Sequence, residues 1–214
     1  MTHRVLVIDD HPLLRKGIGQ LLALQPELGF ELAAEAGSGQ AGLEAATSLQ
    51  PDLILLDLEM PEMGGIETLR ALREHGVAVP IIILTASARD EDIAESLSLG
   101  ASGYLLKDMD PERLLESLSR VIDGEIVISP ALTRTLCRAM RRYQGNSDIT
   151  LGRLTARERE ILALLARGFS NKLMARELDI TEGTAKVHVR NLLRKMKLRT
   201  RVEAAVWAVQ NGLG

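Results

Sequence analysis

Aspartate residues follow directly after two apolar segments in the first part of the chain. Asp9 and Asp10 come after VLVI at residues 5–8, and Asp57 comes after LILL at residues 53–56. An ionised carboxylate is costly to bury without a partner, so we expect these side chains to lie at an open edge of the fold, where a cation can join them. An all-oxygen set of ligands suits Mg²⁺, which takes one or two protein carboxylates and keeps several waters.

A hydroxyl and an ammonium group follow two further apolar segments. Thr85 comes after IIIL at residues 81–84, and Lys107 comes after GYLL at residues 103–106. Such a set suits phosphoryl transfer to a carboxylate, in which Asp57 is the nucleophile while a metal ion and a lysine neutralise the phosphoryl oxygens. Each residue alone has a simpler explanation, as a helix cap, a strand end or a solvated tip. Their joint position at the ends of successive segments favours phosphoryl chemistry.

The segments that carry these residues alternate with longer stretches of helical periodicity. Three of the four segments named above are almost wholly apolar, as parallel strands covered on both faces must be. A fifth apolar segment runs over residues 30–37. Residues 12–24 and 112–122 each place apolar side chains on one helical face. The alternation predicts a doubly wound, five-stranded parallel sheet with helices on both faces, in which ligands bind beyond the carboxyl ends of the strands.

The length of the chain favours two compact domains. It has 214 residues, of which 46% are hydrophobic and 26% charged, and this exceeds the common size of a single domain. No apolar run approaches the roughly 20 residues of a membrane span, and no secretory pattern follows Met1, so we expect a cytoplasmic protein. The single cysteine, Cys137, excludes an intramolecular disulfide and a cysteine-rich metal site.

The two parts of the chain have opposite net charge. Residues 1–128 contain 9 Lys and Arg against 22 Asp and Glu, a net charge of −13, whereas residues 129–214 contain 17 against 7, a net charge of +10. A basic domain suits a polyanionic partner, and an acidic domain suits the binding of cations or the repulsion of that same polyanion. We expect one domain at residues 1–124, a linker with one helix at 125–148 and a second domain at 149–214.

The basic domain is predicted to contain four short helices. Thr155 with Glu158 forms a capping box for the first helix, and Gly168 ends it. Ser170 is the predicted cap of the second helix. The other predicted boundaries are Thr181 and Met196 for the third helix, and Thr200 with Glu203 and then Gly212 for the fourth.

The third helix has an apolar stripe opposite a basic face. A short helix, a tight turn and a helix with a basic face predict a helix-turn-helix, whose second helix enters the major groove of DNA. Val187 fits this interpretation, because an apolar side chain among cations can contact a thymine methyl group. A basic, solvated helix is the alternative. The stripe consists of Ala185, Val189, Leu192, Leu193 and Met196, and the predicted DNA-binding residues are Thr184, Lys186, Val187, Arg190 and Arg194.

The acidic domain resembles the receiver domain of response regulators, which has a flavodoxin-like fold. VIDDHP, LILLDLEMPEMGG, ILTAS and GYLLKD match that family in order and spacing. The resemblance implies that a sensor histidine kinase phosphorylates Asp57. It further implies that Mg²⁺ is held by Asp10, Asp57 and the backbone carbonyl of Glu59 with help from Asp9, and that Thr85, Tyr104 and Lys107 form the switch.

The basic domain resembles the LuxR-type output domain. LTARERE, NKLMARELDITEGTAKVHVRNLLRKMKL and RTRVEAAVWA carry this resemblance, and the whole chain is similar to the NarL/FixJ class, most of all to its nitrate/nitrite regulators. The resemblance implies base contacts from the third helix, dimerisation through the fourth helix on double-stranded DNA with inverted half-sites, and a contact with RNA polymerase. A fourth helix that only completes the core is the alternative. The predicted dimerisation residues are Val202, Val206, Trp207 and Val209.

These features predict a transcription regulator that is not an enzyme. In our hypothesis the unphosphorylated acidic domain blocks the DNA-reading helix, and phosphorylation of Asp57 relieves the block through local contacts. One alternative is a DNA-binding protein that does not depend on phosphorylation. Another is a Mg²⁺-dependent phosphohydrolase of the haloacid-dehalogenase kind, with Glu59 as general acid; its nucleophile would however end the first strand, whereas Asp57 follows the third predicted strand.

Overall fold

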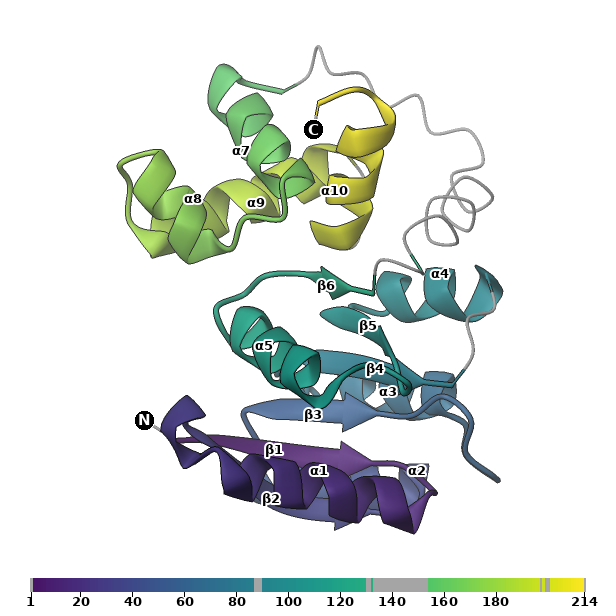
Figure 1. Ribbon diagram of the computed structural model, residues 1–214. Helices are drawn as coiled ribbons and strands as arrows, with labels where there is room; N and C mark the ends of the chain where they lie inside the picture. Colours follow the sequence, from purple (N-terminus) through teal and green to yellow (C-terminus); the bar gives the residue numbers. More distant parts are fainter. Residues whose placement is uncertain are drawn as a thin grey trace.

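The computed structural model describes most of the chain in two folded regions (Figure 1). It covers residues 2–86, 90–129, 132, 154–196, 198 and 201–213, without the side chains of residues 90, 91, 94, 202 and 210. The predicted linker helix and the predicted cap at Thr200 lie outside the described residues. Within the described ranges, no helix has both the length and the apolar character that crossing a membrane requires.

The N-terminal region is a parallel sheet covered by helices on both faces, as predicted. The strand order is β2-β1-β3-β4-β5-β6, and every neighbouring pair is parallel. The apolar segments form the strands because both of their faces are covered; Leu53 to Leu56, for example, are all buried. The strands are β1 (His3–Ile8), β2 (Phe30–Ala36), β3 (Leu53–Leu56), β4 (Ile81–Thr85), β5 (Gly103–Leu106) and β6 (Val127–Ile128).

The prediction of five strands is wrong, because a sixth strand extends the sheet. β6 pairs with β5 through Val127 opposite Gly103 and Ile128 opposite Tyr104. A two-residue strand is too short for its alternation to stand out in the sequence. It lies beyond the predicted boundary at residue 124.

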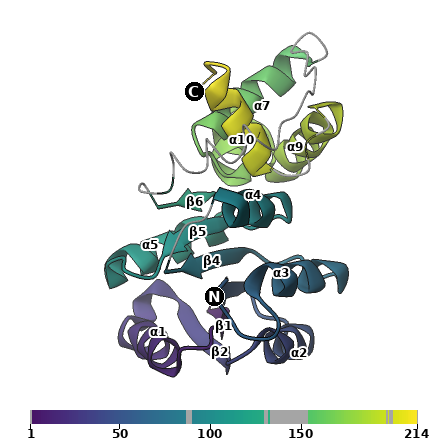
Figure 2. The same cartoon turned by 90° about the vertical axis from the view of Figure 1, so that its right-hand side faces the viewer.

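Alternate residues of each strand supply two separate apolar cores. Val5 and Val7 pack with α1 and α5, whereas Leu6 and Ile8 belong to the core on the opposite face. The two helical layers are visible on either side of the sheet in Figure 2. The helices are α1 (Pro12–Leu24), α2 (Gly39–Leu49), α3 (Gly65–Glu74), α4 (Asp90–Ser98) and α5 (Pro111–Ile122), with a short 3-10 turn, η1 (Pro26–Leu28).

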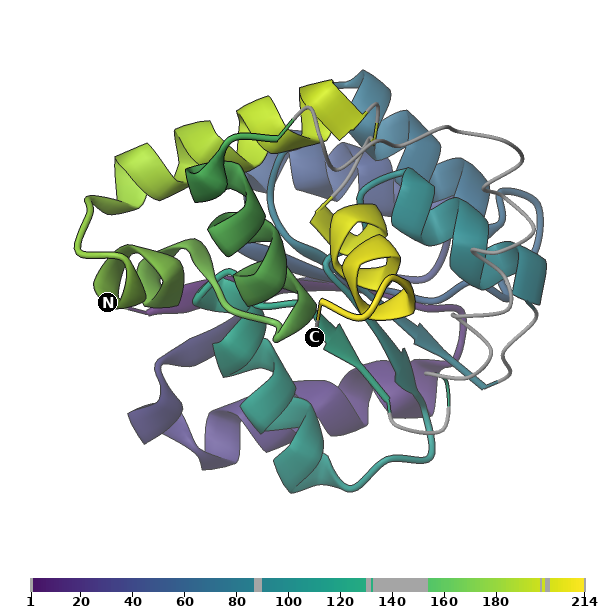
Figure 3. The same ribbon diagram turned by 90° about the horizontal axis from the view of Figure 1, so that it is seen from above.

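The C-terminal region is a helical domain with its own core. It lies beyond the β6 edge of the sheet, with α10 beside α4 (Figures 1 and 3). The capping box of Thr155 and Glu158, the end of the first helix near Gly168 and the cap at Ser170 are confirmed. The helices are α7 (Ala156–Ala166), α8 (Asn171–Glu177), α9 (Glu182–Met196) and α10 (Arg201–Gln210).

Glu158 connects the beginning of α7 to the end of α9. Its carboxylate accepts hydrogen bonds from the Thr155 backbone at 2.8 Å and from Lys195 Nζ at 2.7 Å. Burial alone would raise the pKa of Glu158, but the bonds from Lys195 and Thr155 outweigh it and lower the pKa. A lowered folded-state pKa means that the ionised group stabilises the fold above its unfolded pKa, and that this contribution is lost as the pH falls through the folded pKa.

We therefore expect Glu158→Gln to lower the free energy of unfolding of the C-terminal domain at pH 7 by about 1 to 3 kcal/mol. The difference from the wild type should shrink when denaturant unfolding is repeated below the ordinary carboxyl pKa of 4.5. Glu160→Gln is the matched control, since Glu160 is 52% exposed and pairs with Arg157 within the same helix. Equal losses for the two variants would contradict the role given to Glu158.

Candidate functional site

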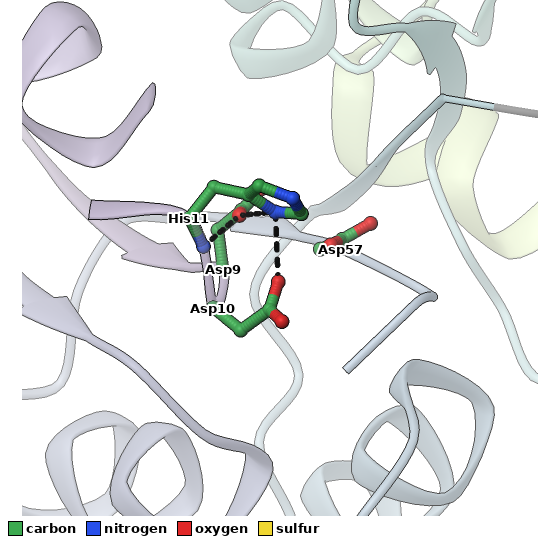
Figure 4. Close-up of side chains that lie close together, drawn as sticks. All are labelled: Asp9, Asp10, His11 and Asp57. Carbon is green, nitrogen blue, oxygen red and sulfur yellow. Dashed lines mark hydrogen bonds and ion pairs between the residues drawn. The ribbon is translucent and has the colours of Figure 1, made fainter. Parts of the chain in front are cut away.

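Asp9, Asp10 and Asp57 lie together at the carboxyl ends of β1 and β3 (Figure 4). These strands are neighbours, and the Asp57 backbone donates to the Ile8 carbonyl at 2.9 Å. Asp9 and Asp57 are buried at 2% and 1% exposure, whereas the Asp10 side chain is 29% exposed. The cluster therefore opens to solvent through Asp10.

Lys107 reaches the same cluster from the end of β5. Its Nζ donates to Asp57 Oδ2 at 2.7 Å and lies 2.8 Å from Asp9 Oδ2. Burial, together with repulsion from Asp9, outweighs the Lys107 hydrogen bond and raises the pKa of Asp57. Burial favours the neutral amine of Lys107, but its bonds to Asp57 and Asp9 prevail and raise its pKa. One ammonium thus serves two buried carboxylates, which leaves negative charge for a further cation to neutralise.

The oxygen atoms of the cluster fit a magnesium ion. Asp9 Oδ2 and Asp10 Oδ1 each have one close nitrogen neighbour, Lys107 Nζ and His11 Nδ1 respectively, at 2.8 Å, and a carboxylate oxygen can accept from more than one direction. Their lone pairs remain available to a hard cation, which prefers carboxylate oxygens. Glu59 is exposed, and its backbone N–H donates to Asp57 Oδ1 at 3.2 Å. The use of its carbonyl as a ligand remains a prediction.

Two residues near the cluster were missed by the sequence reasoning. A Cβ at Gly65 would lie 2.0 Å from the Asp57 carbonyl oxygen, so the beginning of α3 can approach β3 only with glycine there. The signal was the Gly64-Gly65 pair after Asp57. His11 is the second missed residue: it belongs to the cluster, and its signal was its position directly after two aspartates.

Thr85 and Tyr104 connect the cluster to the side of the sheet that α4 covers. Thr85 ends β4 at 1% exposure, and its carbonyl accepts a hydrogen bond from the Lys107 backbone at 2.8 Å. Tyr104 in β5 is fully buried, in one apolar cluster with Leu97 of α4 and Val206 of α10. One apolar cluster therefore extends from β5, the strand that leads to Lys107, through α4 to α10 of the C-terminal domain.

The predicted DNA-binding residues form an exposed face of α9. Lys186, Arg190 and Arg194 are exposed, as is Val187, with 43% of its surface accessible. Thr184 is also exposed and lies at the beginning of the helix, where its backbone donates to Thr181 Oγ1 at 3.1 Å. The opposite face is buried in the domain core through Ala185, Val189, Leu192 and Met196.

The predicted dimerisation residues of α10 differ in their surroundings. Trp207 is 7% exposed and packs in the core of the C-terminal domain, so it offers little surface to a second copy. Val206 packs in the apolar cluster of the N-terminal domain, and Val209 is 51% exposed. Val202 lies in α10, but its side chain is outside the described part.

Polar contacts also join the two domains. Lys172 Nζ of α8 lies 3.3 Å from Asp123 Oδ1, directly after α5. Within the C-terminal domain, Arg201 at the beginning of α10 donates to the Phe169 carbonyl at 2.5 Å. Its burial lowers its pKa to about 10, an effect that Glu125, just before β6, opposes from the other domain. A groove of about 580 Å³ between the domains is bordered by receiver residues around Gly100 and Gly124 and by Lys186 of α9.

Sequence comparisons place the two regions of the chain in two known domain families. Residues 5–119 match the family model "Response regulator receiver domain", and residues 152–208 match "Bacterial regulatory proteins, luxR family". The chain belongs to the response regulators of two-component systems and has a LuxR-type DNA-binding domain, which makes it a regulator of transcription. These two domains imply a sensor kinase and DNA as partners.

Within this class the chain is similar to nitrate/nitrite regulators. It is 50% identical to the nitrate/nitrite response regulator protein NarL of Escherichia coli (strain K12), over 96% of this chain and 94% of that protein. It is 46% identical to NarP of the same organism, over 97% and 94%. Among solved structures, a LuxR-family two-component response regulator from Aurantimonas sp. SI85-9A1 matches with a TM-score of 0.60 and 29% identity, over 67% of this chain and all of that chain.

Proposed function

We propose that a sensor histidine kinase phosphorylates this regulator on Asp57 and that phosphorylation controls DNA binding by α9. The observation that carries this proposal is the buried Asp57 carboxylate at a strand end, held by Lys107 Nζ at 2.7 Å beside two further aspartates. We assign receiver function to residues 1–124 together with β6, the linker to the rest of 125–148 and DNA binding to 149–214. The similarity to NarL and NarP supports nitrate or nitrite as the signal that reaches the kinase.

The residues of the site divide the transfer step between them. An ionised Asp57 oxygen attacks phosphorus, the new O–P bond forms, and the phosphohistidine nitrogen leaves with the electron pair of the broken P–N bond. No general base is needed, because the nucleophile carries no proton. Lys107 balances charge on the phosphoryl oxygens, and Thr85 donates its hydroxyl to one of them. Asp9, Asp10, Asp57 and the Glu59 carbonyl would hold Mg²⁺, which when bound supplies further charge neutralisation.

The switch, in this proposal, acts through the contact between α4 and α10. Recruitment of Thr85 to the phosphoryl group changes the packing of Tyr104, which shares its apolar cluster with α4 and with Val206 of α10. Release of Val206 by the receiver would free the face of α10 that is predicted to dimerise. The receiver and a second copy of the chain would then compete for one apolar surface.

In the arrangement of the two domains described above, which we call closed, the receiver hinders DNA binding because it lies close to α9. The base-reading side chains of α9 are exposed, so the receiver does not cover them directly. Lys186 nevertheless borders the groove between the two domains. A DNA duplex that holds α9 in its major groove would collide with the receiver there. Lys172 also forms an ion pair with Asp123, and this pair would have to break before Lys172 could bind a DNA phosphate. The opened protein would bind inverted half-sites as a homodimer and contact RNA polymerase from there.

Genome-wide footprinting with and without a small phosphodonor tests the proposed function. We expect few protected sites without the donor and many more with it, arranged as paired half-sites. The unphosphorylated intact chain should also bind a recovered site more weakly than a fragment from residue 147 onward, because the fragment lacks the receiver. Equal affinities of the intact chain and the fragment would refute the blocking role of the receiver.

We expect Arg190→Ala to weaken operator binding by about 1 to 3 kcal/mol, because Arg190 is an exposed cation in the middle of the reading face. The measurement is binding to matched and mismatched operators at one salt concentration. Lys16→Ala is the control: it also removes one exposed cation, but from α1 of the receiver. Equal effects of the two substitutions would mean that net charge rather than a base contact determines affinity.

We further propose that the chain is a regulator without turnover of its own on external phosphomonoesters. Glu59 has the spacing of a general acid two residues after the nucleophile, but Glu59 is exposed and its hydrogen bond to Asp57 Oδ1 is made by its backbone N–H. Family membership supports a regulator, and the basic α9 would have no role in a hydrolase. Steady hydrolysis of a simple phosphomonoester would contradict this.

A further inference from the structure

The imidazole of His11 lies against the carboxylates of the proposed magnesium site. Its Nδ1 is 3.1 Å from Asp9 Oδ1 and 2.8 Å from Asp10 Oδ1, and its backbone N–H donates to Asp9 Oδ1 at 2.8 Å. Figure 4 shows the ring beside Asp9 and Asp10, with Asp57 across from them. The side chain is 64% exposed, so burial does not force it into this position.

Four side chains of this edge are close enough to share one ion. Asp9, Asp10, His11 and Asp57 each offer one ligand atom, and these atoms all lie within 4.8 Å of one another. Ligands on opposite sides of an octahedral ion are about 4.2 Å apart when each metal–ligand distance is about 2.1 Å. The present separations are therefore close to those that one ion requires. Asp9 is nearly inaccessible and shares the single Lys107 ammonium with Asp57, so the cluster carries more negative charge than its present neighbours neutralise.

An imidazole changes which ion such a site prefers. Mg²⁺ favours oxygen ligands, whereas imidazole suits Fe, Ni, Cu and Zn, and affinity among first-row divalent ions rises from Mn²⁺ to Cu²⁺. We propose that His11 is a direct metal ligand and gives this site a preference for first-row transition-metal ions over Mg²⁺. The inference rests on the proposed function, because it adds a ligand to the same site. The ion held beside Asp57 would then depend on the supply of transition metal as well as of magnesium.

The competing explanation is that His11 only orients the two aspartates by hydrogen bonding. In that case loss of the imidazole would lower the affinity for all divalent ions by the same factor, since each of them uses Asp10 and Asp57. If His11 is a direct nitrogen ligand, its loss should instead lower the affinity for transition-metal ions more than the affinity for Mg²⁺. The two explanations are therefore separated by the ratio of affinities.

Calorimetric titration of the full-length protein with Mg²⁺, Co²⁺ and Ni²⁺ in turn tests the proposal. We expect His11→Asn to weaken Co²⁺ and Ni²⁺ binding about tenfold or more, the range seen even for the loss of outer-shell partners, and to weaken Mg²⁺ binding much less. His75→Asn is the matched control, because His75 lies at the end of α3 with its Nδ1 2.9 Å from the Ala71 carbonyl, outside the cluster. It should leave all three affinities unchanged.

The absorption spectrum of bound Co²⁺ provides a second readout and should change in His11→Asn and in His11→Gln. Equal weakening of the three ions, or an unchanged Co²⁺ affinity and spectrum, would overturn the proposal. Wild-type protein that binds Co²⁺ through His11 but does not bind Mg²⁺ would support the ligand role and contradict the magnesium part of the proposed function. Circular dichroism of each variant shows that it is folded.

Discussion

Asp57→Asn should abolish stable phosphorylation of the protein by a phosphodonor. Asparagine has nearly the shape of aspartate, so the buried position at the end of β3 is retained, but its amide lacks the anionic oxygen that attacks phosphorus. Asp9 and Asp10 remain, and neither should replace the nucleophile, since the proposed site uses both of them to hold the metal ion. Intact-protein mass spectrometry after treatment with the donor measures the phosphate directly.

The same substitution should make operator affinity independent of the phosphodonor. In the wild type we expect the donor to strengthen binding by about 5- to 150-fold, the range of typical coupling energies between two sites. Asp110→Asn is the matched control, because Asp110 carries a carboxylate that is 75% exposed, close in sequence to Lys107 but directly before α5. Phosphate that persists in Asp57→Asn, or that disappears in Asp110→Asn, would show that the acceptor has been misassigned.

Lys107→Met should destabilise the receiver strongly in the absence of divalent ions. Methionine preserves much of the side-chain volume but removes the ammonium that lies 2.7 Å from Asp57 and 2.8 Å from Asp9. Removal of one partner from a buried ion pair costs about 3 to 5 kcal/mol, because the remaining charge is uncompensated. Two carboxylates lose their partner here, so we expect a loss of about 3 kcal/mol or more in denaturant unfolding with a chelator present.

Saturating Mg²⁺ should reduce that loss, because the ion then neutralises the carboxylates that Lys107 had balanced. Lys16→Ala is again the control; its amine is 73% exposed and pairs with Glu35, so its removal should change stability by about 0.5 kcal/mol at most. The Lys107 variant should also lose the response of operator binding to the donor. A stability loss that is identical with and without Mg²⁺ would contradict a shared charge balance between the lysine and the ion.

Most of the strands could be predicted because their sequences permit little else. β3 and β5 begin and end at the predicted residues, and both are apolar segments with buried residues on both faces. The acidic residues at the ends of β1 and β3 could be placed on one edge because the carboxyl ends of parallel strands share an edge. β6 was missed because its two residues form a strand only through their pairing with β5.

What the sequence could not provide is which groups meet across the fold. That Lys107 bridges Asp9 and Asp57 depends on the register of three strands, and that the His11 ring turns toward Asp10 depends on a side-chain rotation. The apolar residues of α10 predicted a contact but not its partner. The structure packs Trp207 in its own domain and Val206 against the receiver. Either place buries an apolar side chain, so hydrophobicity alone does not tell which residue packs in which place.

The affinity of the full-length protein for one operator, measured with and without the phosphodonor at fixed salt and Mg²⁺, tests the central claim most directly. If the aspartate at the end of β3 governs the DNA-reading helix, the dissociation constant should fall by about 5-fold or more with the donor, in step with the fraction of protein that carries phosphate. An unchanged dissociation constant in a fully phosphorylated sample would contradict the account.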